Sequence, residues 1–318
     1  MKEIQVTVQR FNPDDNKGSY EETFTFEVQD GLTILDALNK IKWEIDGTLT
    51  HRMSCRSAIC GSCAVRVNGK SKLACKSQLD EFLIDNKISI GPIGNTEILK
   101  DLVVDLEPFW GKLHKVKPWL DAPMPKDTTK ENYQSHEGYK KIEDASTCIL
   151  CACCISECNS LKADSNYVGP AALAKAQRFI DDSRDRSFNA RLRAISEPTK
   201  VWDCTHCGEC SERCPTDAKP LHRIEELRER VVNAGIQNNN GARHLLSFFS
   251  SVGSSGTLDE RKIPIESVGM GNTDAIISDV LPVGLKMLSH GKNPPLLHHN
   301  VDNVKEVRKL FKKLNKLP

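Results

Sequence analysis

The stretch SCRSAICGSCAVRVNGKSKLAC, residues 54–75, decides the fold of the first part of this chain. It contains a C-x4-C-x2-C pattern and one more distant cysteine, and these residues are Cys55, Cys60, Cys63 and Cys75. Between the last two of them, Asn68-Gly69 separates AVRV from KSKLA and is a strong signal for a two-residue β-hairpin turn. The stretch therefore predicts a cysteine-rich loop and a hairpin that brings the last cysteine back to the loop.

This cysteine pattern is the plant-type arrangement for a [2Fe–2S] cluster, with these four cysteines as its ligands. Small residues let the backbone pass close to the inorganic sulfurs, and the loop provides Ala58, Gly61, Ser62 and Ala64. Backbone N–H groups aimed at the sulfurs stabilise the reduced cluster and tune its potential. The alternative is a structural zinc site with four cysteines, which the x4 gap and the surrounding strand pattern disfavour.

The flanking segments predict a β-grasp fold, which is a mixed sheet packed over one helix. Residues 3–10 and 23–30 alternate between apolar and polar in the manner of strands, and residues 88–93 indicate another strand. Thr33 stands in the N-cap position of a helix. The apolar residues that recur at helical spacing around it are Leu32, Ile34, Leu35, Leu38, Ile41 and Ile45.

Two further cysteine runs share the pattern C-x2-C-x2-C-x3-C, and Pro215 follows the second run. In bacterial ferredoxins, the first three cysteines of such a run hold one cubane cluster and the fourth cysteine ligates the other. The pattern predicts one [4Fe–4S] cluster on Cys148, Cys151, Cys154 and Cys214. It predicts a second on Cys158, Cys204, Cys207 and Cys210. Cys153 has no place in this scheme, and we expect a buried free thiol beside a cluster.

Composition and charge exclude several classes of protein. With 44 Lys+Arg against 43 Asp+Glu, the chain lacks the basic excess that a nucleic-acid partner requires. The most apolar segment, residues 275–288, is interrupted by Asp279, Pro282 and Lys286, which argues against a membrane span. The close cysteine spacing and the lack of a secretory segment argue against a disulfide framework. We therefore expect a chain that is soluble or peripheral by itself.

Helical patterns surround the later cysteine runs at residues 170–182, 188–195 and 219–232. We therefore expect an α+β chain with a β-grasp domain over residues 1–100 and a connector over residues 101–145. A helical domain with two cubane-type clusters would follow over residues 146–235, and a C-terminal extension for partner docking over residues 236–318. In this extension, one helical face is apolar and consists of Val304, Val307, Leu310, Phe311 and Leu314. The other face is basic and consists of Lys305, Arg308, Lys309, Lys312, Lys313 and Lys316.

The segments SCRSAICGSCAVRVNG, CILCACCISEC, GPAALAKAQRFIDDSRD and the final CxxxCP resemble the iron–sulfur subunit of succinate dehydrogenases and fumarate reductases. The resemblance spans residues 1 to about 235. It implies an electron-transfer subunit of an oxidoreductase complex, without catalytic residues of its own. It implies an FAD-containing flavoprotein partner and a quinone-reactive membrane anchor, with FAD and quinone bound by those partners only. It also implies a peripheral position at the membrane, at the cytoplasmic face by default or at the periplasmic face by co-export with a signal-bearing partner. The [2Fe–2S] cluster would then lie near the flavin.

Three departures from the family pattern indicate a variant type. The family's last cluster is a [3Fe–4S] centre whose cysteines match Cys158, Cys204 and Cys210, whereas Cys207 stands where an apolar residue is usual. A [4Fe–4S] cluster is therefore favoured over [3Fe–4S] for the third centre. The family's quinone-contacting tryptophan after the first run is missing, and the tail beyond residue 235 exceeds the usual length. These departures resemble enzymes with a cysteine-rich, heterodisulfide reductase-like anchor, which the tail is expected to dock.

Two alternative functions stay open at this point. A heterodisulfide reductase-like or glycolate oxidase-like flavoenzyme complex would use the same three clusters with a different substrate. A zinc-binding interaction module would be colourless, and would hold zinc in place of about ten irons per chain.

Overall fold

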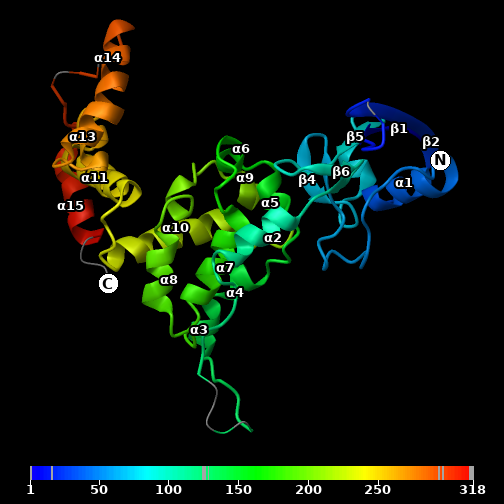
Figure 1. Ribbon diagram of the computed structural model, residues 1–318, viewed down its shortest axis with the longest axis horizontal. Coiled ribbons are helices and arrows are strands. Elements are labelled where there is room, and N and C mark those ends of the chain that lie inside the picture. Colours follow the sequence, from blue (N-terminus) through cyan, green and yellow to red (C-terminus); the bar gives the residue numbers. More distant parts are fainter. Residues whose placement is uncertain are drawn as a thin grey trace. The chain divides into compact units, whose positions relative to one another are not determined.

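The computed structural model describes residues 2–15, 17–123, 127, 129–292, 294–295 and 297–314. The chain divides into two compact units, Met1–Leu227 and Arg228–Pro318 (Figure 1). The strands are β1 (Lys2–Arg10), β2 (Tyr20–Val28), β3 (Ala64–Val67), β4 (Lys70–Leu73), β5 (Lys87–Gly91), β6 (Ile98–Lys100) and β7 (Val103–Val104). None of the helices in the described ranges combines the length and apolar character needed to span a bilayer.

Five of these strands form one sheet in the order β2-β1-β5-β3-β4. Strand β1 pairs antiparallel with β2 and parallel with β5, so the sheet is mixed. Strands β3 and β4 form the expected hairpin, and its turn residues Asn68 and Gly69 have φ values of 48° and 82°. Positive φ at both central residues is the requirement of a type I′ turn, which Asn-Gly satisfies. The predicted β-grasp within an α+β chain is confirmed.

The core of this domain lies between the sheet and helix α1 (Ile34–Lys40). Thr33 caps the helix as predicted, because its hydroxyl accepts a hydrogen bond from the Asp36 N–H and its own N–H donates to the Asp36 carboxylate. Alternate residues of the strands point inward, and α1 buries one face against them. The buried apolar residues of β1 and α1 are Ile4, Val6, Val8, Ile34, Leu35, Ala37 and Leu38.

Ile45 departs from the prediction. The helix continues from α1 into a π-helical turn, Ile41–Ile45, in which the Asp46 N–H bonds the carbonyl of Ile41. Ile41 is buried as expected, but Ile45 is 49% exposed. The wider turn rotates the last residues away from the face that a 3.6-residue period would give them.

The remaining α-helices of the first unit follow the β6–β7 hairpin (Figure 1). They are α2 (Glu107–His114), α3 (His136–Lys140), α4 (Glu143–Ser146), α5 (Cys153–Ser156), α6 (Asn159–Ala163), α7 (Pro170–Ile180), α8 (Phe188–Ile195) and α9 (Glu209–Glu212). Helix α10 (Pro220–Asn233) begins in the first unit and ends in the second. Helices α7, α8 and α10 lie where the sequence predicted them, whereas the short helices α2 to α6 were not expected.

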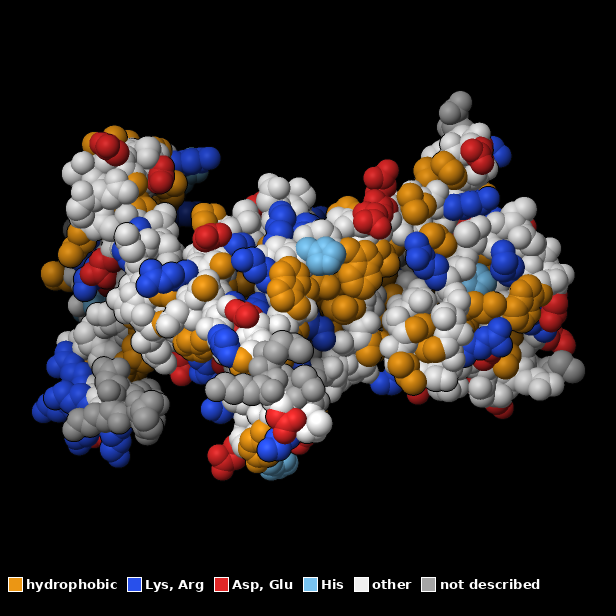
Figure 2. All heavy atoms as spheres, turned by 60° about the horizontal axis from the view of Figure 1, so that its bottom comes forward, with side chains coloured by type: hydrophobic (Ala, Val, Ile, Leu, Met, Phe, Trp, Pro, Cys, Tyr) orange, Lys and Arg blue, Asp and Glu red, His pale blue; other side chains and the backbone are white. Residues whose placement is uncertain are grey.

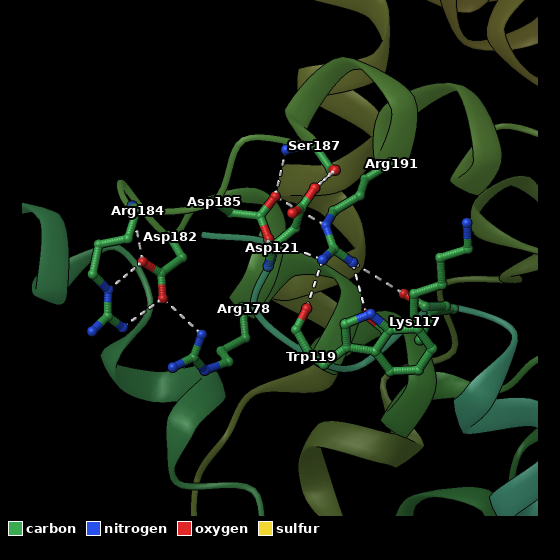
Figure 3. Close-up of polar contacts among 10 residues, drawn as sticks. Lys117, Trp119, Asp121, Arg178, Asp182, Arg184, Asp185, Ser187 and Arg191 are labelled. Carbon is green, nitrogen blue, oxygen red and sulfur yellow. Dashed lines mark hydrogen bonds and ion pairs between the residues drawn. The ribbon is translucent and has the colours of Figure 1, made fainter. Parts of the chain in front are cut away.

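A buried ionic network holds the loop between α7 and α8 (Figure 3). Arg178 and Arg184 both bond the Asp182 carboxylate, whose side chain is inaccessible to solvent. Arg191 bonds Asp185 through two nitrogens, at 3.1 and 2.9 Å. The same guanidinium donates to the carbonyl oxygens of Lys117 and Trp119 at 2.8 and 2.6 Å. The network therefore fastens the connector to the helical domain.

The second unit consists of the end of α10 and of helices α11 (Asn240–Ser255), α12 (Lys262–Val268), α13 (Thr273–Ala275), α14 (Leu281–Ser289) and α15 (Val304–Leu314), with a π-helical turn at Ile276–Val280. Helix α15 packs on α11, where the rings of Phe249 and Phe311 lie 4.7 Å apart. Leu310, expected on the same packed face, is 57% exposed. Figure 2 shows Lys and Arg side chains gathered at the lower left, over this unit. Lys316 and the side chain of Leu314 lie outside the described residues.

Candidate metal centres

The first cysteine group lies in the loop before β3, and its last member follows β4. Positive φ values at Arg56, Ala58 and Gly61 turn successive peptide groups of this loop inward. As a result, the N–H groups of Ser57, Ile59 and Cys60 donate to the Cys55 sulfur at 3.4, 3.4 and 3.3 Å. The Cys75 N–H donates to the Cys63 sulfur at 3.4 Å, which links the hairpin to the loop.

The two ends of this group differ in their electrostatics. Cys60 is exposed, and hydrogen bonds with the backbone of Cys55 and Ser62 lower the pKa of its thiol to about 6. Cys63 is buried, and that burial raises the pKa of its thiol to about 12. A thiolate at Cys63 therefore needs a positive partner, which a metal would supply.

The second cysteine group surrounds a hollow between the first run and the end of the second run. Four cysteines line this hollow, and they are Cys148, Cys151, Cys154 and Cys214. Leu150 and Ala152 take φ values of 57° and 65°, which turns the short C-x2-C-x2-C segment around the hollow. The Ala218 N–H donates to the Cys214 sulfur at 3.2 Å. Burial raises the pKa of Cys154 well above its usual value.

The third group surrounds a separate hollow, lined by Cys158, Cys204, Cys207 and Cys210. Cys158 stands at the N-terminus of α6, and burial raises the pKa of its thiol. Burial also raises the pKa of Cys210 to about 12, and the charges of Cys204 and Cys158 act in the same direction. Cys207 is exposed yet lines this hollow with the other three.

These donor sets suit iron–sulfur clusters. Each hollow is lined by four cysteines, and a backbone N–H group donates to the sulfur of one of them, Cys214 in one hollow and Cys204 in the other. Cysteine ligands with N–H groups directed at sulfur are what such clusters use. In the described ranges, no three His, Cys, Asp or Glu side chains lie close enough together for a single metal ion.

Cys153 is fully buried, as predicted, but its surroundings were not expected. It packs into the hydrophobic core of the β-grasp domain. Its carbonyl oxygen accepts a 2.8 Å hydrogen bond from the Ser71 hydroxyl, which also bonds the Glu157 carboxylate at 2.6 Å. Cys153 and its neighbours therefore join the helical domain to the sheet. No spacing rule connects Ser71 with Cys153, so sequence reasoning missed this junction.

Comparison with known proteins adds the following. Residues 5–111 match the family described as a 2Fe-2S iron-sulfur cluster binding domain, and residues 144–218 match a 4Fe-4S dicluster domain. The chain is 36% identical over 275 residues to the 8-methylmenaquinol:fumarate reductase iron-sulfur subunit of Wolinella succinogenes, which covers 84% of this chain and 85% of that protein. It is 37% identical over 233 residues to the succinate dehydrogenase iron-sulfur subunit of Paracoccus denitrificans, covering 72% and 88%.

A solved structure has a similar fold. It is a chain of the Sdh1 complex of Mycobacterium smegmatis in the apo form, with a TM-score of 0.65 and 22% sequence identity. The match covers 74% of this chain and 98% of that chain.

Proposed function

Because this chain belongs to the family of iron–sulfur subunits of succinate dehydrogenases and fumarate reductases, we propose that it conducts electrons between an FAD-containing subunit and a quinone-reactive membrane anchor. Three iron–sulfur clusters would supply the redox chemistry, and the polypeptide holds and spaces them. The observation that carries the proposal is the gathering of all cysteines except Cys153 into three groups, two of which line hollows with four cysteines each.

We assign the clusters to these groups. The loop group (Cys55, Cys60, Cys63 and Cys75) would hold the [2Fe–2S] cluster, a proposal supported by the N–H groups directed at its sulfurs. The hollow of Cys148, Cys151, Cys154 and Cys214 would hold the first [4Fe–4S] cluster, and the hollow of Cys158, Cys204, Cys207 and Cys210 the last cluster. Anaerobically purified protein should contain about ten irons and matching acid-labile sulfide per chain. A zinc-loaded, colourless protein would contradict the proposal.

The last cluster would be [4Fe–4S] and not [3Fe–4S]. The support is the position of Cys207, which lines the hollow with Cys158, Cys204 and Cys210. Electron paramagnetic resonance (EPR) of the air-free oxidised protein should show no three-iron signal, and Cys207→Ala should introduce one. A three-iron signal in the unmodified protein would refute this assignment.

The anchor would be a cysteine-rich, heterodisulfide reductase-like protein that docks on the second unit. An alignment covering 84% of the chain necessarily extends past residue 235, so the 8-methylmenaquinol:fumarate reductase relative shares part of the tail. Helix α14 supports docking as well, since its apolar residues are exposed to solvent. Truncation after Gly235 should leave the clusters in place and abolish co-purification with the anchor. If the truncated chain kept the anchor and quinone activity, the docking role would be wrong.

The protein would be held at the cytoplasmic face of the membrane by that anchor. An anchor-free preparation should then partition into the aqueous phase, whereas the complete complex should sediment with membranes. Protease added to sealed right-side-out vesicles should spare the chain, and cleavage under those conditions would place it on the outer face.

A further inference from the structure

Gly61 lies where the first cysteine loop touches the second cysteine group. It directly follows Cys60 and stands two positions before Cys63. A Cβ atom on Gly61 would lie 2.7 Å from the Cα and 2.8 Å from the Cβ of Cys151. Carbon atoms without a bond between them do not approach so closely, so the two backbones are in direct contact and only glycine fits. Gly61, Cys63 and Cys151 also line one small cavity at this seam.

We propose that the contact between Gly61 and Cys151 is the route by which electrons cross between the first and second cysteine groups, and that it sets the separation of their clusters. The inference rests on the proposed function. In this step one electron leaves one centre and reduces the other, and no proton or leaving group moves. Gly61 acts as a positioning residue, because any side chain there would push the two ligand segments apart.

Two further contacts hold the same segments together. Lys76, next to Cys75, donates from its Nζ to the carbonyl oxygen of Pro215, next to Cys214, at 2.7 Å. On another side, the Ser71 hydroxyl bonds the Cys153 carbonyl and the Glu157 carboxylate. Each of these contacts joins residues within a few positions of cluster cysteines on both sides. The spacing of the first two clusters is therefore built into the ligand loops themselves and does not depend on the connector.

The test compares Gly61→Ala with Gly69→Ala in the purified complex. Gly69 is a matched control because its φ is +82°, close to the +72° of Gly61, while nothing lies within 4 Å of its added Cβ. Both variants therefore place an alanine at a similar positive φ, and only Gly61→Ala meets Cys151. Microwave-power saturation of the reduced [2Fe–2S] EPR signal reports the magnetic influence of the neighbouring cluster, and freeze-quench spectra report the rate of electron transfer between them.

We expect the Gly61→Ala signal to saturate at clearly lower power, with transfer slowed several-fold, and Gly69→Ala to match the unmodified protein. Equal behaviour of the two variants, with full iron content, would overturn the proposal, whether both are normal or both impaired. Iron and sulfide missing from the unmodified protein would instead reject the proposed function.

If Gly61→Ala fails to retain its clusters, Lys76→Met decides the matter. This change removes the bond to Pro215 from an exposed position and introduces no clash. The control is Lys70→Met, since Lys70 is also exposed and lies on the neighbouring strand β4. The proposal is supported if Lys76→Met lowers the saturation power and the transfer rate, by less than is expected of Gly61→Ala, while Lys70→Met changes neither. Equal values for Lys76→Met and Lys70→Met overturn it.

Discussion

In the first unit the buried side chains of the sheet and helices are largely apolar, whereas in the second unit α11 buries Ser247, Ser251 and Ser255. The hydroxyl groups of these serines are hydrogen-bonded within the unit. For example, the Ser255 hydroxyl donates to the carbonyl oxygen of Thr257 at 2.9 Å. Among the described residues from Arg228 onward, the buried apolar residues are Val231, Ala242 and Ile263. The second unit therefore gains much less from apolar burial than the first.

On the surface, the second unit has a helix, α14, with many exposed apolar side chains. Helix α14 exposes apolar side chains around most of its circumference, and Leu281 and Leu288 are 50% and 57% exposed. A helix with so wide an apolar surface is normally covered by another element or partner. The comparison teaches that the first unit places its apolar side chains in its own core, whereas the second leaves many of them on its surface, as expected of the docking role proposed above.

The largest loss of stability is expected from a substitution that leaves a buried charge of the first unit without its ion-pair partner. Arg191→Ala leaves the inaccessible Asp185 carboxylate without its partner, and should destabilise the chain by about 3–5 kcal/mol. Arg193→Ala, at an exposed position of the same helix, should change the stability by less than about 0.5 kcal/mol. Denaturant unfolding of the purified chain measures both. Similar values for the two variants would mean that the ionic network contributes little.

A matched pair of leucines tests the comparison directly. Leu192 in α8 is fully buried, so Leu192→Ala should lower the free energy of unfolding by about 2–5 kcal/mol. Leu281→Ala in α14 should lower it by less than about 0.5 kcal/mol in the isolated chain. In the complex, the Leu281 variant should instead weaken binding of the anchor in a pull-down assay. A large loss of stability from Leu281→Ala in the isolated chain would break the distinction between the units.

Side-chain packing within the second unit should contribute modestly to the free energy of unfolding. Phe311→Leu keeps an apolar side chain on α15 and removes the ring contact with Phe249, which should cost about 0.5–1.5 kcal/mol. The ring also lies against Gly253, where an added Cβ would come within 2.6 Å of it. Proteolysis between residues 297 and 304 should become faster in this variant, while the visible spectrum of the clusters stays unchanged. An altered spectrum would show that the units are not independent.

The smallest effect concerns acid stability of the first unit. Burial, with a contribution from Lys42, lowers the pKa of His51 from 6.5 to about 4. The unfolded chain thus binds a proton that the folded chain rejects, so stability is lost as the pH falls from about 6.5 towards 4. His51→Gln should flatten the slope of stability against pH in this window. An unchanged slope would assign the acid sensitivity to other groups.

Sequence patterns between residues close together along the chain predicted much of this fold. The cap at Thr33, the turn at Asn68-Gly69 and the helices α7, α8 and α10 depend on residues close together in sequence, and they were found where expected. The π-helical turn that exposes Ile45 was not predictable, because it changes the period on which the prediction rested.

The cysteine spacing predicted which sulfurs lie together, and the hollows bring the same residues together. Their role as ligands stays a prediction. Three features of the site had no signal in the sequence: the contact of Gly61 with Cys151, the placement of Cys153 in the sheet core and the bond from Lys76 to Pro215. Each joins segments far apart along the chain, and only the packing of one domain on the other determines them.

The interleaving of the two later cysteine runs sets an order for biogenesis. The hollow lined by the first run is completed by Cys214, which belongs to the second run. The hollow lined by the second run is completed by Cys158, which belongs to the first. While the chain emerges from the ribosome, the loop group is complete once Cys75 has been made, but neither hollow can close before the run from Cys204 to Cys214 has followed. On the proposed assignment of the clusters, iron delivery to the β-grasp domain could therefore begin during translation, whereas the helical domain would receive its two clusters after nearly the whole first unit has been synthesised.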